Sequence, residues 1–124
     1  IHYAMNANRM PEASGYGMLM ALKKAGLTLD DVKVMEINEN FACVPLVSLR
    51  ILAGGDHEKV ELAKLKEKTN VNGSAIAIGH ASTASGARII MNLMYELRRR
   101  GGGYAIGSIS GGLAQSNSCI IKVE

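Results

Sequence analysis

Three short polar segments of this 124-residue chain carry the side-chain types that perform chemistry at a carbonyl group. They are residues 38–42 (Asn-Glu-Asn-Phe-Ala), 79–83 (Gly-His-Ala-Ser-Thr) and 108–112 (Ser-Ile-Ser-Gly-Gly). A neutral imidazole can accept a proton from a nucleophile or donate a hydrogen bond to a carbonyl oxygen. An asparagine amide can fix a water or a carbonyl, and glycines let backbone N–H groups approach an oxyanion.

Each of these signals also has a structural interpretation. A single histidine such as His80, in a loop next to a glycine, can be simply structural or exposed. Asn38 precedes a predicted helix, where asparagine is common as an N-cap or in an Asx-turn. The segment 108–112 has the composition of an ordinary hairpin turn. Taken singly, none of the three segments identifies a site.

The apolar pattern predicts the elements that would position these segments. Residues repeating at three- and four-residue spacing predict helices, and short apolar or alternating runs predict strands. The predicted helices are 14–25, 41–53, 57–68 and 84–100, and the predicted strands are 32–37, 74–78, 104–109 and 119–123. The last two strands would form a hairpin around a Gly/Ser-rich turn, and residues 1–10 form an irregular lead-in. His80 would then follow a strand, at the sheet edge where open α/β folds bind ligands.

Alternation of strands and helices, followed by a closing hairpin, predicts an α/β fold with a mixed sheet and helices on both faces. The length fits one domain, residues 1–124, without an internal repeat or linker. Aromatic residues make up only 4% of the chain. The core must therefore be built from aliphatic residues and methionine.

Composition also excludes several classes of function. No apolar run approaches the roughly 20 residues that cross a bilayer, so we expect no membrane partner. The net charge of +3 is too small to indicate nucleic acid. The two cysteines do not form a disulfide framework, which favours a cytoplasmic location. No cluster has metal-ligand spacing, so no metal is expected. The basic run 98–100 fits a solvated helix end, with attraction of an anionic ligand as the alternative.

Two longer stretches give these segments a family context. Residues 70–80 (Asn-Val-Asn-Gly-Ser-Ala-Ile-Ala-Ile-Gly-His) and 84–88 (Ala-Ser-Gly-Ala-Arg) resemble the thiolase patterns Asn-x-Asn-Gly-Gly-Ala-x-Ala-x-Gly-His-Pro and Gly-Ala-Ser-Gly-Ala-Arg. The segment 38–42 resembles the thiolase motif Asn-Glu-Ala-Phe. The resemblance runs from about Pro11 to the end of the chain and concerns the C-terminal half of a thiolase only. It implies one half of a layered αβαβα fold.

The resemblance implies roles for the candidate site residues. His80 corresponds to the histidine that activates the nucleophilic cysteine and helps to bind the thioester oxygen. Asn38 corresponds to the asparagine that anchors a water in the same oxyanion hole, and Phe41 corresponds to the wall of the acyl pocket. The nucleophilic cysteine itself belongs to the N-terminal half of a thiolase.

The third segment aligns with the thiolase loop that carries a second catalytic cysteine, the shuttle of the α-proton. An ungapped comparison from Tyr104 places Ser110 on that cysteine and Gly112 on the glycine whose amide forms a second oxyanion hole. Anchoring on the glycine pair would instead select Ser108. We prefer Ser110, because the strands on both sides then keep their register.

The chain departs from the family pattern at several points. Asn40 replaces the usual alanine and places a polar group by the pocket, while Ala81 and Thr83 replace a proline and a glycine. Residues 61–69 look like an insertion. Ser110 is the most consequential departure, because an alkoxide is far harder to reach than a thiolate, whose parent thiol has a pKa near 8.5.

The two cysteines of the chain are weak substitutes for the missing thiol. Cys43 lies in the first turn of a predicted helix, where a thiol pKa can fall, but we expect it to be a buried apolar residue. Cys119 is expected to be a strand residue packed in the sheet.

The resemblance therefore implies a subunit of a thiolase-type acyl-CoA C-acyltransferase, acting in 3-oxoacyl-CoA thiolysis or in Claisen condensation. Its implied partners are an acyl-CoA and an N-terminal thiolase half on a separate chain, giving a hetero-oligomer. It implies no cofactor, since the coenzyme A thioester is the substrate. The alternative is a thiolase-like subunit with altered or no condensing activity, kept for acyl-CoA binding or complex assembly.

Overall fold

The computed structural model describes residues 1–55 and 59–124, and its centre is a four-stranded mixed sheet. Its elements, in chain order, are β1 (His2–Ala4), the 3-10 helix η1 (Ala7–Glu12), α1 (Ala13–Ala25), β2 (Val32–Ile37), α2 (Cys43–Leu52), α3 (Lys59–Glu67), α4 (Ala75–Ile78), α5 (Ser85–Arg99), β3 (Gly103–Gly111) and β4 (Gln115–Val123). The strand order is β1-β4-β3-β2. β2 and β3 are parallel, whereas β4 pairs antiparallel with both β3 and β1.

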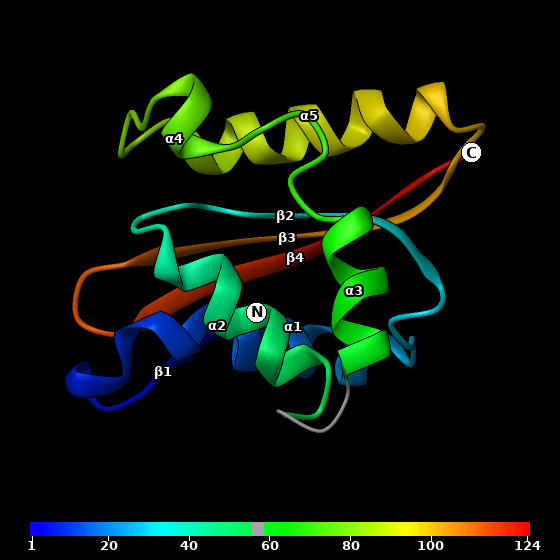
Figure 1. The fold of residues 1–124 in the computed structure, drawn as a ribbon. Helices are drawn as coiled ribbons and strands as arrows, with labels where there is room; N and C mark the ends of the chain where they lie inside the picture. Colours follow the sequence, from blue (N-terminus) through cyan, green and yellow to red (C-terminus); the bar gives the residue numbers. More distant parts are fainter. Residues whose placement is uncertain (56–58) are drawn as a thin grey trace.

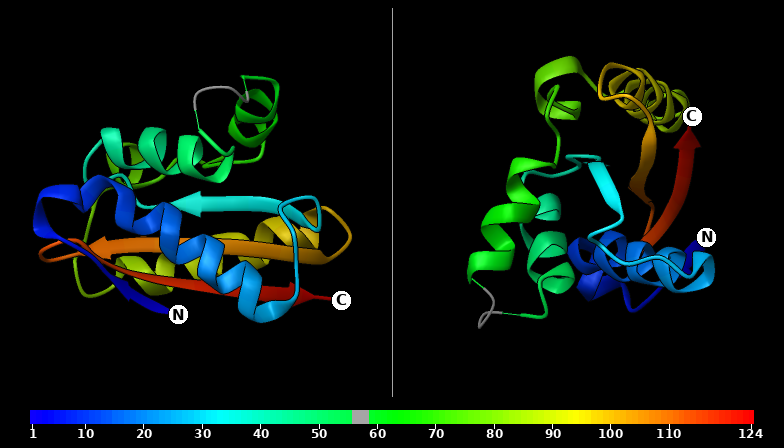
Figure 2. Two further views of the ribbon diagram at one scale, coloured as in Figure 1. Left: turned by 90° about the horizontal axis from the view of Figure 1, so that it is seen from below. Right: turned by 90° about the vertical axis from the view of Figure 1, so that its right-hand side faces the viewer.

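Helices cover both faces of the sheet, as the sequence predicts. In Figure 1, α4 and α5 lie on one side of the strands, and α1, α2 and α3 lie on the other. The two views of Figure 2 show α1 running along the strands and α3 standing to one side, near β2. None of the helices in the described ranges is long and apolar enough to cross a membrane.

Each face of the sheet has its own apolar core. On the α1 side the fully buried side chains include Met18, Met35 and Ile106. On the α5 side, Ile89, Leu93 and Leu97 occur at helical spacing and pack against Val34 and Ala105 of the sheet. The predicted apolar stripe of the helix over 84–100 is thus confirmed, and its role is to hold α5 on the β2–β3 pair.

Three sequence predictions about elements are wrong. Residues 74–78, predicted as a strand, contain the short helix α4, so His80 does not follow a sheet strand. The lead-in is not irregular, because β1 pairs with β4 and η1 follows it. The closing hairpin is longer than predicted, so Ser108 and Ser110 lie within β3 and not in the turn. The predicted helix 57–68 starts at His57, which lies outside the described residues; α3 covers Lys59–Glu67.

The basic run at the end of α5 is held by its own helix. Glu96 accepts hydrogen bonds from the side chains of Arg99 and Arg100, and from Asn72 of the loop before α4. Arg98 lies over the ring of Tyr95, 5.6 Å from its centroid. These contacts favour the structural interpretation of the arginines as a helix end.

Candidate functional site

The candidate residues Asn38 and Ser110 are joined through Asn40. Asn38 directly follows β2 and is fully buried, and Ser110 lies near the end of the parallel strand β3. Asn40 Oδ1 accepts hydrogen bonds from Asn38 Nδ2 and from Ser110 Oγ, each at 3.0 Å. Asn40 Nδ2 donates to the Ser110 carbonyl at 2.9 Å. Two positions at which the chain departs from the family pattern are therefore in direct contact.

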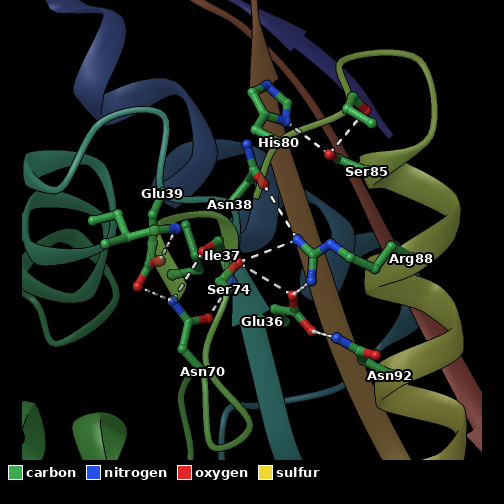
Figure 3. A network of polar contacts seen from close by, with 12 residues as sticks. Glu36, Ile37, Asn38, Glu39, Asn70, Ser74, His80, Ser85, Arg88 and Asn92 are labelled. Carbon is green, nitrogen blue, oxygen red and sulfur yellow. Dashed lines mark hydrogen bonds and ion pairs between the residues drawn. The ribbon is translucent and has the colours of Figure 1, made fainter. Parts of the chain in front are cut away.

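Asn38 is also held from its other side by a buried ion pair. Arg88 of α5 reaches Glu36 of β2 at 2.5 Å, and Arg88 Nη2 lies 3.5 Å from Asn38 Oδ1. Ser74 contacts both charged groups, and Asn92 donates to the second oxygen of Glu36. Figure 3 shows this network between the sheet and α5. Because Asn38 accepts from Arg88 and donates to Asn40, its amide orientation is fixed, and among the described contacts only one of its two side-chain N–H groups is used.

The segment that leads to His80 is anchored to the same strand end. The Asn70 amide donates to the Ile37 carbonyl and accepts from the Ile37 N–H. Asn70 also lies 3.3 Å from Glu39, whose second oxygen accepts from the N–H of Ile76 in α4 at 2.8 Å. These bonds tie the 70–76 segment to the end of β2 and so place the following loop beside the strand end.

His80 is exposed in the loop between α4 and α5, and its tautomer follows from its neighbours. Its Nδ1 lies 2.7 Å from Ser85 Oγ, and that hydroxyl donates its only proton to the Ala81 carbonyl at 3.0 Å. Ser85 must then accept from His80, so Nδ1 carries the proton. In this tautomer Nε2 carries the lone pair and is the proton acceptor, the form that a general base requires.

His80 and Arg88 line a common hollow of about 390 Å³, together with Ser85 and Ala84 at the start of α5. In the view of Figure 3, His80 and Asn38 lie at the same end of the polar network. No hydrogen bond joins His80 directly to Asn38 or Ser110 in the part of the chain that the structure describes. Arg88, which lines the hollow with His80, is the residue that reaches Asn38, with Nη2 3.5 Å from Asn38 Oδ1.

The other residues singled out in the sequence lie at the edge of this site. The Phe41 side chain is 70% exposed, so the described residues do not enclose an acyl pocket around it. Gly112 lies in the β3–β4 turn with φ of 55°, a backbone conformation that favours glycine. Ser108 is occupied by a hydrogen bond from Ser118. The structure gives Ser110, and not Ser108, the contact with Asn40.

The predictions for the cysteines had different outcomes. Cys43, expected to be buried, is exposed at the start of α2. Cys119 lies in β4 and is half-buried, as expected, and its burial raises the pKa of its thiol. Neither thiol is hydrogen-bonded to Asn38 or Asn40 among the described contacts. The described residues also contain no group of three or more His, Cys, Asp or Glu that could hold a metal ion.

Sequence reasoning missed the residues that hold the site in place. Glu36, Arg88 and Ser85 were not assigned any role, although all three determine the position of a candidate residue. Glu36 gave a usable signal, because a carboxylate inside the apolar strand 32–37 must find a partner if it is buried. Asn38 is not the N-cap of α2, since Ala42 holds that position and no side chain caps the helix.

Comparisons with known proteins identify the family of this domain. A family model described as the C-terminal domain of thiolase matches residues 1–123. The mitochondrial 3-ketoacyl-CoA thiolase of Homo sapiens is 44% identical over 118 residues, which are 95% of this chain and 26% of that protein. The acetyl-CoA acetyltransferase of Syntrophomonas wolfei is 43% identical over 109 residues, or 83% of this chain and 26% of that enzyme.

Solved structures show the same relationship. The crystal structure of human mitochondrial 3-ketoacyl-CoA thiolase has a TM-score of 0.86 at 40% identity and covers 100% of this chain and 29% of that chain. The Bacillus anthracis acetyl-CoA acetyltransferase has a TM-score of 0.83 at 30% identity, over 98% of this chain and 28% of the other. This chain thus spans about a quarter of the length of these relatives. The chain belongs to the thiolase family and has the fold of its C-terminal domain.

Proposed function

We propose that this domain supplies the base and the oxyanion-binding groups of a thiolase-type acyl-CoA C-acyltransferase. In this proposal a thiolase N-terminal half provides the nucleophilic cysteine. His80 accepts the cysteine proton through Nε2, and His80 and the free N–H of Asn38 stabilise the thioester oxygen, the latter through a water. The Gly112 amide forms the second oxyanion hole. The reaction is thiolysis of a 3-oxoacyl-CoA or its reverse, a Claisen condensation.

The tautomer of His80 carries this proposal. A histidine with its proton held at Nδ1 presents a lone pair at Nε2, and the orienting hydroxyl of Ser85 is itself fixed by the Ala81 carbonyl. This is the arrangement of a base oriented by a third group, which activates a nucleophile. Among the described contacts neither cysteine is bonded to His80, and in this proposal the N-terminal half supplies the nucleophile.

Two further observations support a partner half and an acyl-CoA substrate. α4 and α5 expose large apolar side chains, including Ile76, Ile78, Ile90, Met91 and Tyr95. Phe41 adds another exposed apolar group beside the candidate site. Exposed apolar patches of this kind mark interaction surfaces. A solved structure of the human relative is a complex with CoA, and we propose a CoA thioester as the substrate here, without a further cofactor.

The origin of the N-terminal half is a separate question. The sequence led us to expect it on another chain, in a hetero-oligomer located in the cytoplasm. That arrangement and that location stay predictions. The chemistry proposed for His80 and Asn38 requires the N-terminal half to pack against this domain, in one polypeptide or in two.

A second candidate function is favoured by the contact between Ser110 and Asn40. A serine whose hydroxyl is bonded to a neutral amide is a poor acid or base. The domain would then bind an acyl-CoA or support assembly, with altered or no condensing activity. The two candidates differ in whether turnover occurs once the N-terminal half is present.

The test is reconstitution with a thiolase N-terminal half, followed by thiolysis of acetoacetyl-CoA with free CoA. We expect His80→Ala to lower kcat/KM by about 100-fold or more, as for loss of a general base. His2→Ala is the matched control, because His2 is exposed and bonded to Asn117 on β4. Equal activity of the two variants would contradict the base role. A complex that binds acetoacetyl-CoA without turnover would support the second candidate.

A further inference from the structure

The amide of Asn40 makes three hydrogen bonds, and together they leave only one orientation for it. Its Nδ2 faces the Ser110 carbonyl, which can only accept. Its Oδ1 therefore faces Asn38 Nδ2 and Ser110 Oγ, both of which then donate. A flipped amide would place an N–H against the Asn38 N–H and an oxygen against the Ser110 carbonyl. The orientation of Asn40 is thus set by its partners.

The position of the Ser110 proton follows from this orientation. A hydroxyl has one hydrogen, and Ser110 directs it to Asn40 Oδ1. A neutral amide oxygen accepts a hydrogen bond but does not take up the proton. A hydrogen bond donated by the protonated form of a group favours that form over the ionised one. Because Ser110 is only 3% exposed, water competes little for this contact.

We propose that Asn40 is a positioning residue that holds whatever acid stands at position 110 in its protonated, neutral form. The effect of Asn40 on turnover rests on the proposed function above, since only an active thiolase site needs a proton shuttle at position 110. The contact makes Asn40 and Ser110 one functional unit. Placing a cysteine at position 110 would therefore not restore a proton shuttle unless Asn40 were changed as well.

The test measures the thiol pKa that Ser110→Cys introduces, read from thiolate absorbance as a function of pH. The background is Cys43→Ser with Cys119→Ser, because the raised pKa of Cys119 would otherwise overlap the signal. Adding Asn40→Ala removes the acceptor and should increase the thiolate fraction about fivefold at a fixed pH below the midpoint, the equivalent of one ordinary hydrogen bond. Adding Asn40→Asp instead should lower the thiolate fraction at the same pH, because a carboxylate accepts the same hydrogen bond and adds a negative charge.

Controls separate this effect from general disruption. Asn92→Ala removes an amide that contacts Glu36 and not Asn40, so it should leave the thiol pKa unchanged. The charged groups that reach Asn40 through Asn38 are Arg88 and its partner Glu36, and Glu39 precedes Asn40 in the chain. These groups and His80 are the same in every variant and cancel in the comparison. If Asn40→Ala does not fold, Asn40→Leu, which has a similar size and no hydrogen-bond acceptor, replaces it as the deciding variant. The proposal is supported if the thiol pKa rises in the order Ala, Asn, Asp at position 40. It is overturned if the folded Ala and Asn proteins have the same thiol pKa.

The activity arm uses the reconstituted complex and compares Ser110→Cys with Ser110→Cys/Asn40→Ala. We expect the double variant to exceed the single variant in kcat by several-fold, with KM little changed. Equal kcat values in an active complex would overturn the consequence for turnover. A complex without any activity would contradict the proposed function, whereas the thiol titration, which needs no partner, would still decide the role of Asn40.

Discussion

Ser85 Oγ lies 2.7 Å from Nδ1 of His80 and donates its own proton to the Ala81 carbonyl. A buried serine at the start of α5 thereby sets the tautomer of an exposed histidine in the preceding loop. The helix that fills one face of the sheet also orients the candidate base. The Ser85 hydroxyl therefore couples the packing of α5 on the sheet to the orientation of the His80 ring.

Removal of this hydroxyl should impair the base without removing it. We expect Ser85→Ala to lower kcat/KM of the reconstituted enzyme by about tenfold, because the imidazole can then adopt either tautomer. The pH profile of kcat/KM should shift as well, which a purely structural change would not cause. Ser85→Thr keeps a hydroxyl and should restore most of the activity. Unchanged kinetics in a folded Ser85→Ala variant would show that the contact is incidental.

The buried ion pair between Glu36 and Arg88 should be important for stability. We expect Arg88→Ala to lower the free energy of unfolding by about 3 kcal/mol, because it leaves the Glu36 carboxylate buried without its cation. Arg9→Ala is the matched control, since Arg9 and Glu12 form an exposed pair that should contribute less than about 1 kcal/mol. Chemical denaturation of both variants measures the difference. Similar losses of unfolding free energy in Arg88→Ala and Arg9→Ala would contradict the claim that burial makes the Glu36–Arg88 pair important for stability.

Glu96 should make the free energy of unfolding depend on pH in the acid range. Hydrogen bonds from Asn72, Arg100 and Arg99 lower the pKa of Glu96 to about 2, from an ordinary value of 4.5. The unfolded chain therefore binds this proton at a higher pH than the folded chain does. The stability that Glu96 contributes is fully present above about pH 4.5 and is lost as the pH falls toward 2.

The measurement is the free energy of unfolding from pH 6 down to about pH 2, for the wild type and for Glu96→Gln. The glutamine variant should be less stable at pH 6, and the difference should shrink as the pH falls. Glu124→Gln is the control, because Glu124 is an exposed residue near the C-terminus. A constant difference between the wild type and Glu96→Gln over this range would contradict the assignment.

Alanine substitutions at Gly107, which lies in β3 beneath α5, and at Gly86, which lies in α5, should change stability in opposite directions. A Cβ at Gly107 of β3 would lie 2.7 Å from a methyl carbon of Ile89 and 3.0 Å from one of Leu93. Gly107→Ala should lower the free energy of unfolding by about 1–3 kcal/mol. Gly86→Ala meets no atom within 4 Å and should raise it by about 0.5–1 kcal/mol, through helix propensity. Thermal denaturation checks both signs, and destabilisation by Gly86→Ala would refute this account of the helix.

The sequence predicted the elements that have a long or clear apolar pattern. The strand 32–37 is found with the predicted bounds, and the helix over 84–100 is found as α5. Residues 74–78 were predicted wrongly because a run of alternating Ala and Ile is too short for its period to decide between helix and strand. Ile76 and Ile78 are exposed, so sheet burial does not explain their apolar character.

Polar residues misled the prediction of the hairpin. The start of β4 contains Gln115, Ser116, Asn117 and Ser118, which are not typical of a strand. Ser116 and Ser118 are nevertheless buried, because Ser116 donates to the Ala13 carbonyl and Ser118 donates to Ser108. Ala13 comes from a distant part of the chain, and Ser108 faces Ser118 only once the hairpin has its register. The same applies to Asn40 and Ser110, whose contact only the fold reveals.

The most direct test of the central claim is acylation of the nucleophilic cysteine in a reconstituted complex. The complex of this chain with a thiolase N-terminal half is mixed with acetyl-CoA, and the acetylated cysteine is followed by intact mass. We predict rapid acetylation with the wild-type domain and a rate about 100-fold lower with His80→Ala. Equal rates with the two domains would contradict the claim that His80 activates the cysteine.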